Sequence, residues 1–368
     1  MRIGKVTVKQ IAGGSLLCAG LLLVLAAPRR PAAQDNSGRL HLNVDLVELN
    51  VAVTDRKGNY VSGLRPQDFR ITEDKIPEKI ASFDEGGAPV NGSQSDSEAD
   101  QAGNAGSGAE ASAPPALASA GLANLPATRP IGANVFVLFD TSNYMYRGFV
   151  YAQDAITDFV RSMAAEDNIA FYSYSRDLSR GALLTTDRFN LVRGVRSTVA
   201  GDDAALYNCL LLTVEDAASL RGRKAIVVFS NGPDNASSIP PEDVAELAQS
   251  TGTIIYIIST SAAQNEPVST AAFERMSKAT GGKAYFARNW RDEHQAFSSI
   301  KEDLGHLYTL SYYPKPNPNR GWRAIKVELV GKNLQKYRIR TRDGYSLQQV
   351  NGTGPSYAST ASQSDPEY

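Results

Sequence analysis

The sequence predicts an α/β protein with two parts, a doubly wound, mainly parallel sheet and a small β-sandwich. Strand and helix patterns alternate from residue 130 to residue 306, as in sheets whose parallel strands are joined by crossover helices. Within this region Lys224–Ser230 is an almost continuous apolar run, which is typical of a central strand covered on both faces. Residues 39–85 and 307–348, on either side, alternate apolar and polar side chains and predict half-buried strands.

The first 33 residues form a segment of their own. Three basic residues among the first ten precede an apolar run over residues 11–27, and this pattern predicts a secretory signal peptide, residues 1–33, with cleavage near Gln34. Arg29 and Arg30 follow the apolar run, which leaves an uncleaved membrane anchor as the alternative. We expect a secreted, periplasmic or cell-envelope protein that contacts a membrane only through such an anchor.

Charge and cysteine content narrow the functional classes. Residues 1–33 contain five basic and no acidic side chains, so without them the 38 Lys+Arg become 33 against 39 Asp+Glu. An acidic chain without a basic block excludes nucleic acid as the expected partner. Cys18 lies in the apolar run, so only Cys209 remains and no internal disulfide can form. Cys209 lies in a helical pattern, where we expect a small buried side chain and not a reactive thiol.

The N-terminal part predicts a β unit over residues 39–85, followed by a linker. The expected strands are residues 40–53, a strand beginning at Tyr60, residues 69–74 and residues 79–83. The sequence Asp55-Arg-Lys-Gly58 is the first turn. From residue 86 to residue 129 Ala, Gly, Ser, Asn and Pro dominate, which predicts a disordered linker because few large apolar side chains are available for burial.

The central region, residues 130–306, predicts alternating strands and helices. The expected strands are 134–140, 168–174, a short edge strand ending at 183–184, 224–230, 253–259 and 283–286. The expected helices are 149–163, 189–199, 204–220, one opening at 240–243, 270–279 and 292–304. The fourth helix has proline and two acids in its first turn, and Gly252 ends it.

The C-terminal part predicts strands again. Residues 307–313, 322–330 and 336–342 carry strand patterns separated by turn residues. Three strands are too few for a stable sheet of their own. We therefore predict that residues 307–348 pair with residues 39–85, so that one β-sandwich is built from both ends of the chain with the α/β domain inserted. Residues 349–368 are polar and predicted to be disordered.

The most informative segment is the end of the first central strand, Asp140-Thr-Ser142-Asn-Tyr144. A carboxylate at the carboxyl end of a buried parallel strand lies where open α/β sheets bind ligands, and Ser142 adds a hydroxyl nearby. Alternatively, Asp140 caps the following turn by accepting backbone hydrogen bonds. Tyr144, Tyr146 and Phe149 bring aromatic side chains to the same rim, which suits a partner surface, although Phe149 also fits the helix core.

The alternating elements and this segment resemble a von Willebrand factor A (vWA) domain, with its Rossmann-like sheet, over residues 130–306. The flanks resemble a bacterial exported family known only as VWFA-related. This second resemblance rests on Val53–Gly58 and Gly63–Phe69 before the domain, and on Trp322–Val327 and Arg340–Tyr345 after it.

The resemblance implies a metal-ion-dependent adhesion site (MIDAS) in which three loops hold a divalent cation. The first loop has the form Asp-x-Ser-x-Ser, the second offers a threonine and the third an aspartate. Asp140 and Ser142 match, but Tyr144 replaces the second serine, Ala204 the threonine and Asn231 the aspartate. Because Mg²⁺ prefers six oxygen ligands, these replacements imply a degenerate site and no cofactor.

Three acidic residues leave a metal site open as an alternative. Asp202 or Asp203 could replace the missing threonine, and Asp234 could reach in from the third loop. With such substitutes, Asp140 and Ser142 would hold Mg²⁺ or another divalent cation.

No catalytic motif is present, so we expect no enzyme. The sequence has no Gly-x-Ser-x-Gly, no His-Glu-x-x-His, no phosphate-binding glycine loop and no cysteine pair for zinc. We expect an adhesion-type module that binds a protein or another macromolecule, without metal, through a rim formed by Asp140, Ser142, Tyr144, Ala204 and Asn231. Two alternatives are a structural envelope component with the vWA domain as scaffold, and Mg²⁺-dependent adhesion through a rearranged site.

Overall fold

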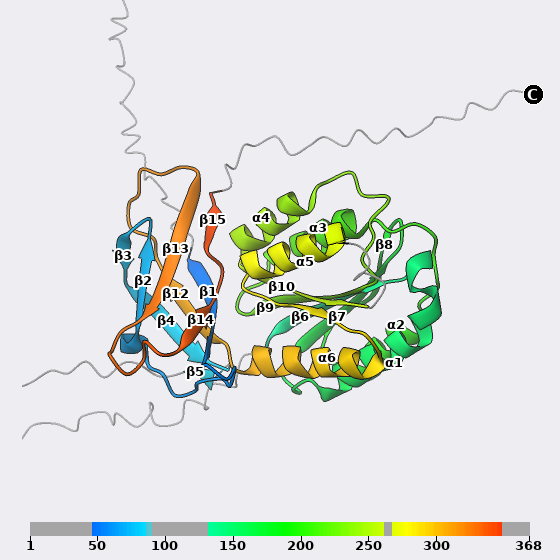
Figure 1. Cartoon of the computed structure of the whole chain (residues 1–368), viewed down its shortest axis with the longest axis horizontal. Helices are drawn as coiled ribbons and strands as arrows, with labels where there is room; N and C mark the ends of the chain where they lie inside the picture. Colours follow the sequence, from blue (N-terminus) through cyan, green and yellow to red (C-terminus); the bar gives the residue numbers. More distant parts are fainter. Residues whose placement is uncertain (1–45, 87, 90–131, 261–266, 348–368) are drawn as a thin grey trace, which may run out of the picture. The chain divides into compact units, whose positions relative to one another are not determined.

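The computed structural model describes residues 46–86, 88–89, 132–260 and 267–347 (Figure 1). The predicted signal peptide, the predicted C-terminal tail and most of the predicted linker lie outside these residues. The linker prediction begins too early, because Ala88–Pro89 forms a short strand, β5, that pairs with β4 (Ile80–Glu85). No helix in the described part of the chain is long and apolar enough to span a membrane.

The α/β domain is built on a six-stranded sheet in the order β11-β10-β9-β6-β7-β8. Its strands are β6 (Asn134–Asp140), β7 (Asn168–Tyr174), β8 (Leu178–Thr185), β9 (Lys224–Ser230), β10 (Thr253–Ser259) and β11 (Ala284–Phe286). All neighbours are parallel except β7 and the edge strand β8, which are antiparallel. The predicted mainly parallel, doubly wound sheet is confirmed.

Helices cover both faces of this sheet (Figure 1). One face carries α1 (Phe149–Ser162), α2 (Arg188–Arg196) and α6 (Trp290–Gly305), and the other carries α3 (Leu206–Ala218), α4 (Pro241–Thr251) and α5 (Pro267–Ala279). Side chains of β6 alternate between the two cores: Phe139 packs on the α1 side and Leu138 on the α3 side. Both are fully buried, and burial of such side chains contributes about 1.5–3 kcal/mol each.

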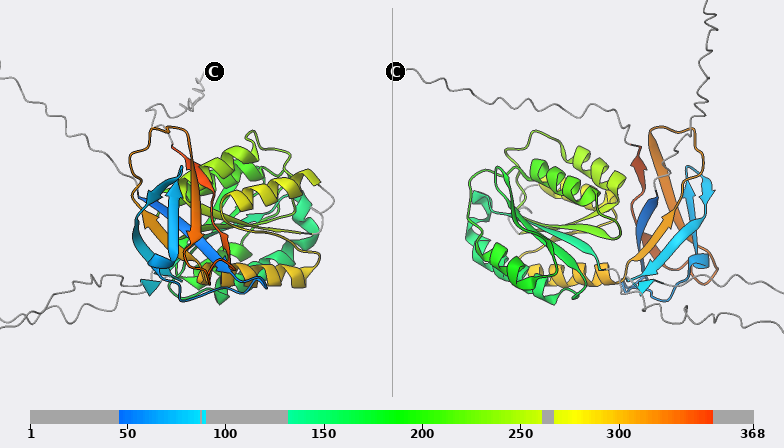
Figure 2. Two further views of the ribbon diagram at one scale, coloured as in Figure 1. Left: turned by 60° about the vertical axis from the view of Figure 1, so that its left-hand side comes forward. Right: turned by 180° about the vertical axis from the view of Figure 1, so that it is seen from behind.

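The two ends of the chain form two antiparallel sheets (Figure 2). One has the order β14-β1-β12-β4-β5 and the other β15-β13-β2-β3. The remaining strands are β1 (Val47–Thr54), β2 (Phe69–Glu73), β3 (Ile76–Glu78), β12 (Tyr308–Tyr312), β13 (Trp322–Leu329), β14 (Arg338–Arg340) and β15 (Gly344–Ser346). Because β1 pairs with β12 and β2 with β13, the predicted pairing of both chain ends is confirmed.

Two local expectations differ from the structure. The strand expected from Tyr60 is only a single bridge between Thr54 and Tyr60. This bridge follows a tight turn in which the Asp55 carboxylate accepts hydrogen bonds from the Lys57 and Asn59 amides. Strands β3 and β15 were not predicted, since three residues each are too few to show a period of two.

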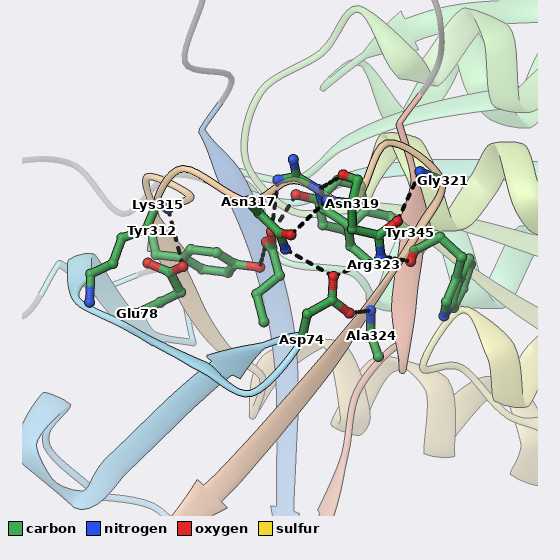
Figure 3. Close-up of polar contacts among 12 residues, drawn as sticks. Asp74, Glu78, Tyr312, Lys315, Asn317, Asn319, Gly321, Arg323, Ala324 and Tyr345 are labelled. Carbon is green, nitrogen blue, oxygen red and sulfur yellow. Dashed lines mark hydrogen bonds and ion pairs between the residues drawn. The ribbon is translucent and has the colours of Figure 1, made fainter.

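The sandwich contains a buried charged network (Figure 3). The carboxylate of Glu73 accepts hydrogen bonds from the hydroxyls of Tyr312 and Tyr345, at 2.8 and 2.9 Å, and forms an ion pair with Arg323 at 2.8 Å. Next to it Asp74 accepts a hydrogen bond from the Ala324 amide at 2.9 Å. These contacts join β2 to β12, β13 and β15.

A second buried carboxylate, that of Asp303 in α6, joins the sandwich to the α/β domain. It accepts hydrogen bonds from Tyr60 and Tyr256, both at 2.6 Å, and pairs with Arg340 of β14 at 2.5 Å. Burial acts to raise the pKa of Asp303, but the charges of Arg340 and Lys283 outweigh it and hold the pKa below its ordinary value.

Candidate functional site at the strand ends

Asp140 ends β6 and lies fully buried at the carboxyl edge of the sheet. Its Oδ1 accepts a hydrogen bond from the Ser142 amide at 2.9 Å. Its Oδ2 accepts hydrogen bonds from Ser230 Oγ at 2.8 Å and from the Asn231 amide at 3.4 Å. The carboxylate therefore caps the turn after β6 and ties it to the end of β9.

A chain of hydroxyl groups extends this network across the sheet. The hydroxyl of Tyr174, in β7, donates to Ser230 Oγ at 3.0 Å, and Ser230 Oγ in turn donates to Asp140. Burial raises the pKa of Asp140, and hydrogen bonds from Ser142 and Ser230 offset only part of this rise. Burial, together with the charge of Asp140, also raises the pKa of Tyr174. Sequence reasoning missed Ser230 and Tyr174, although each is the last residue of its strand and carries a hydroxyl group.

Ser142 supplies one hydroxyl oxygen that could contact a ligand. Its Oγ is buried beside Asp140 and has no hydrogen-bond partner in the described part of the chain. Such a buried hydroxyl lacks the partner that it would have in water.

Asn231 crosslinks two loops through both ends of its side-chain amide. Its Nδ2 donates to the backbone carbonyl of Tyr144, and its Oδ1 accepts a hydrogen bond from Thr260 Oγ1 at 2.7 Å. An aspartate could not make the first of these contacts, because an ionised carboxylate only accepts. The Asn231 amide thus joins two loops, a role that the comparison with a metal-binding third loop did not predict.

Ala204 contributes no side-chain oxygen and holds the second loop through its backbone. It is fully buried. Its amide donates to Asn235 Oδ1 at 2.8 Å, and its carbonyl accepts hydrogen bonds from the amides of Asn235 and Ala236 at 3.0 and 3.1 Å. The second and third loops are thereby bound to each other.

Two of the three acidic residues considered as substitute ligands have other side-chain contacts. Asp234 accepts a hydrogen bond from the Tyr207 amide at 3.0 Å in the first turn of α3, which stabilises that helix end. Asp203 lies 3.6 Å from Arg176 in an exposed ion pair. Asp202 is exposed. At Asp140 the described side chains bring together its own carboxylate and the hydroxyls of Ser142 and Ser230, and Ser230 is already hydrogen-bonded to Asp140 and Tyr174. Mg²⁺ prefers six oxygens, so the residues present do not fit the ion.

Aromatic and apolar side chains are exposed where the first loop passes into α1. Tyr144 is 39% and Tyr146 76% exposed, and Val150 and Tyr151 in the first turn of α1 are also exposed. By contrast, Phe149 is half-buried and packs on Phe139 with ring centroids 5.4 Å apart, as its alternative assignment to the helix core predicted. We call Tyr144, Tyr146, Val150 and Tyr151 the aromatic rim.

Comparison with known proteins identifies the domain. Residues 134–299 match the family described as von Willebrand factor type A domain. This part of the chain is a vWA domain, and the resemblance of residues 130–306 to that domain is confirmed. No curated protein matches the chain.

Several solved structures are similar to this chain at low identity. BatB from Bacteroides thetaiotaomicron is 15% identical over 47% of this chain and 97% of that chain, with a TM-score of 0.40. Proximal thread matrix protein 1 from the mussel byssus is 12% identical over 48% of each chain, with a TM-score of 0.41. A von Willebrand factor type A protein from Catenulispora acidiphila is 11% identical over 59% of this chain and 66% of that chain, with a TM-score of 0.41. At these identities the likeness concerns the fold alone.

Proposed function

We propose that this protein is an exported, adhesion-type module that binds another macromolecule at the strand-end face of its vWA domain, without a metal ion. The observation that carries the proposal is the aromatic rim, where Tyr144, Tyr146 and Tyr151 are exposed next to a capped strand end. Tyrosine is enriched among residues that dominate binding energy, because it buries a large apolar ring and keeps a polar hydroxyl.

The internal hydrogen bonds of the site support recognition without metal. The Asp140 carboxylate caps a turn, the Asn231 amide crosslinks two loops, and Asp234 stabilises α3. A rigid rim requires less ordering on binding than a mobile one. These contacts hold the loops in place by themselves, which is the task that a bound cation would otherwise perform.

The chemistry of the described residues favours binding over catalysis. Burial raises the pKa of Cys209 to about 12, so its thiol stays protonated and unreactive at neutral pH. Asp140, the buried carboxylate at the edge, is enclosed by the hydrogen bonds of Ser142 and Ser230. We therefore assign this face to recognition.

The binding proposal is tested by capturing partners from an envelope fraction with the full chain. Tyr146→Ala and Tyr144→Ala should each weaken capture of a specific partner about tenfold or more, as expected for aromatic residues at the centre of an interface. Tyr313→Ala is the matched control, because Tyr313 is an exposed tyrosine after β12 of the sandwich, and its exposed fraction of 57% lies between those of Tyr144 and Tyr146. A partner retained equally by all three variants would contradict the assignment of this face.

The metal-free part of the proposal is tested separately by calorimetric titration of the full chain with Mg²⁺. No binding heat is expected for the native chain or for Asp140→Asn. Micromolar Mg²⁺ binding that disappears in Asp140→Asn would overturn this part and leave the recognition face intact.

A further inference from the structure

A groove of about 460 Å³ lies between α4 and α5, on the face of the sheet opposite α1 and α6. Its floor is apolar and includes Ala245 of α4 and Ala272 and Met276 of α5. Small side chains at the first two positions leave room between the helices, and the volume suits a few side chains of a ligand and not a whole helix.

Trp322 closes one end of the groove. It begins β13, and the residue is 41% exposed. The ring lies against Gly344 of β15, where a Cβ atom would come within 2.4 Å of it, so the absence of a side chain at Gly344 lets the ring pack on the strand. β15 is attached to α4 by the Ser250 hydroxyl, which donates to the Ser346 carbonyl at 3.1 Å. The Trp322 ring at the end of the groove is thus held in place relative to α4.

The rim of the groove carries an excess of negative charge. Glu242 and Glu246 are one turn apart on α4, so their side chains lie on the same face of the helix. Arg275 of α5 pairs with Glu242 at 3.3 Å, with both side chains largely exposed. Glu246 has no ion pair or hydrogen bond among the described residues, so one carboxylate at the rim is free for a ligand.

We propose that this groove is a second binding site, which takes a lysine- or arginine-bearing segment of a partner protein. The methylene stem of the basic side chain lies along Trp322 and Met276, and its cation meets Glu246. Basic side chains combine an apolar stem with a charged tip, and a cation gains further attraction from the face of an indole ring. An acidic segment or an anionic lipid would instead face an unpaired carboxylate.

Trp322 also provides the readout. The sequence contains two tryptophans, so in Trp290→Phe the fluorescence reports on Trp322 alone. Trp290 is exposed at the start of α6 and does not line the groove, so its replacement should leave the fold unchanged, as circular dichroism can verify. The probe is an acetylated peptide of repeating Ala-Lys-Leu, and its control is the same peptide with Glu in place of Lys.

The lysine peptide should change the Trp322 fluorescence saturably, and the glutamate peptide should not. Glu246→Gln should weaken binding of the lysine peptide about two- to fivefold, as expected for the loss of one exposed charge contact. Glu274→Gln, which removes an exposed charge of α5 outside the groove, should leave its affinity unchanged.

Three results would overturn the proposal. They are no saturable response to the lysine peptide, equal responses to both peptides, or equal effects of Glu246→Gln and Glu274→Gln. The first would leave the groove without this occupant. The second would indicate a merely apolar site, and the third attraction to the acidic protein as a whole.

Discussion

Replacement of Asn231 by aspartate tests whether its amide acts as a crosslink. The change restores the residue type of a metal-binding third loop but removes the hydrogen-bond donor that reaches the Tyr144 carbonyl. The position is 93% enclosed, since the exposed fraction of Asn231 is 7%, and the new carboxylate would lie close to that of Asp140. A buried acceptor left without its donor costs about 1–3 kcal/mol, and repulsion between the two carboxylates adds to this loss.

We therefore expect Asn231→Asp to lower the free energy of unfolding by about 1–3 kcal/mol at pH 7, measured by urea denaturation without divalent cations. The loss should be smaller near pH 5. Burial raises the pKa of the new carboxyl group in the folded state above its unfolded value, so it destabilises the fold increasingly as pH rises and can donate again when protonated.

Asn143→Asp is the control for this experiment. Asn143 lies in the first loop, next to Tyr144, and is exposed, and its replacement adds the same charge without breaking the crosslink. Its free energy of unfolding should change by less than about 0.5 kcal/mol. Equal effects of the two substitutions would refute the crosslink, since a general charge effect would then explain both. An unchanged stability of Asn231→Asp would refute it as well.

Further predictions concern the joint between the parts and the core. Asp303→Asn should destabilise the protein by about 3–5 kcal/mol in urea denaturation, because it breaks a pair whose carboxylate is fully buried and leaves the partly buried Arg340 cation without a counter-charge. By contrast, Asp154→Asn, in an exposed pair with Arg196, should cost about 0–1 kcal/mol. The pKa of Asp303 is lower folded than unfolded, so its contribution is complete above its unfolded pKa and is lost as pH falls. A stability profile between pH 6 and pH 3 should therefore be flatter in Asp303→Asn, and an identical slope would argue against this role. Leu138→Ala should cost about 2–5 kcal/mol, and a loss below 1 kcal/mol would show that the α3-side core can close the cavity.

Much of the fold could be predicted because its signals are local. β6, β7, β9 and β10 have the predicted bounds, since long apolar runs ending in polar residues define buried strands. Short elements were harder: β15 has three residues and carries no periodic pattern. Helix α3 begins at Leu206, two residues later than predicted, because Ala205 has a non-helical backbone conformation, with φ −108° and ψ 57°, and is the N-cap of the helix.

The candidate site was predictable in position but not in its contacts. The motif at Asp140 and Ser142 located the strand-end edge, because any residue ending a parallel strand lies there. The hydrogen-bond partners of the Asn231 side chain, by contrast, are a backbone carbonyl and the hydroxyl of Thr260, and no residue pattern predicts either contact. Whether Asp234 faced the site or capped α3 also depended on loop conformation.

The sequence by itself determined the vWA sheet, its covering helices and the strands at both chain ends, because periodic burial of apolar side chains specifies elements without reference to distant partners. Only the tertiary structure decided how the polar groups are satisfied. Asp303 meets Tyr60 across 243 positions of the chain, and Glu73 meets Arg323 across 250. Hydrogen bonds and ion pairs depend on atomic positions to within a few tenths of an ångström, and the packed fold alone sets those positions.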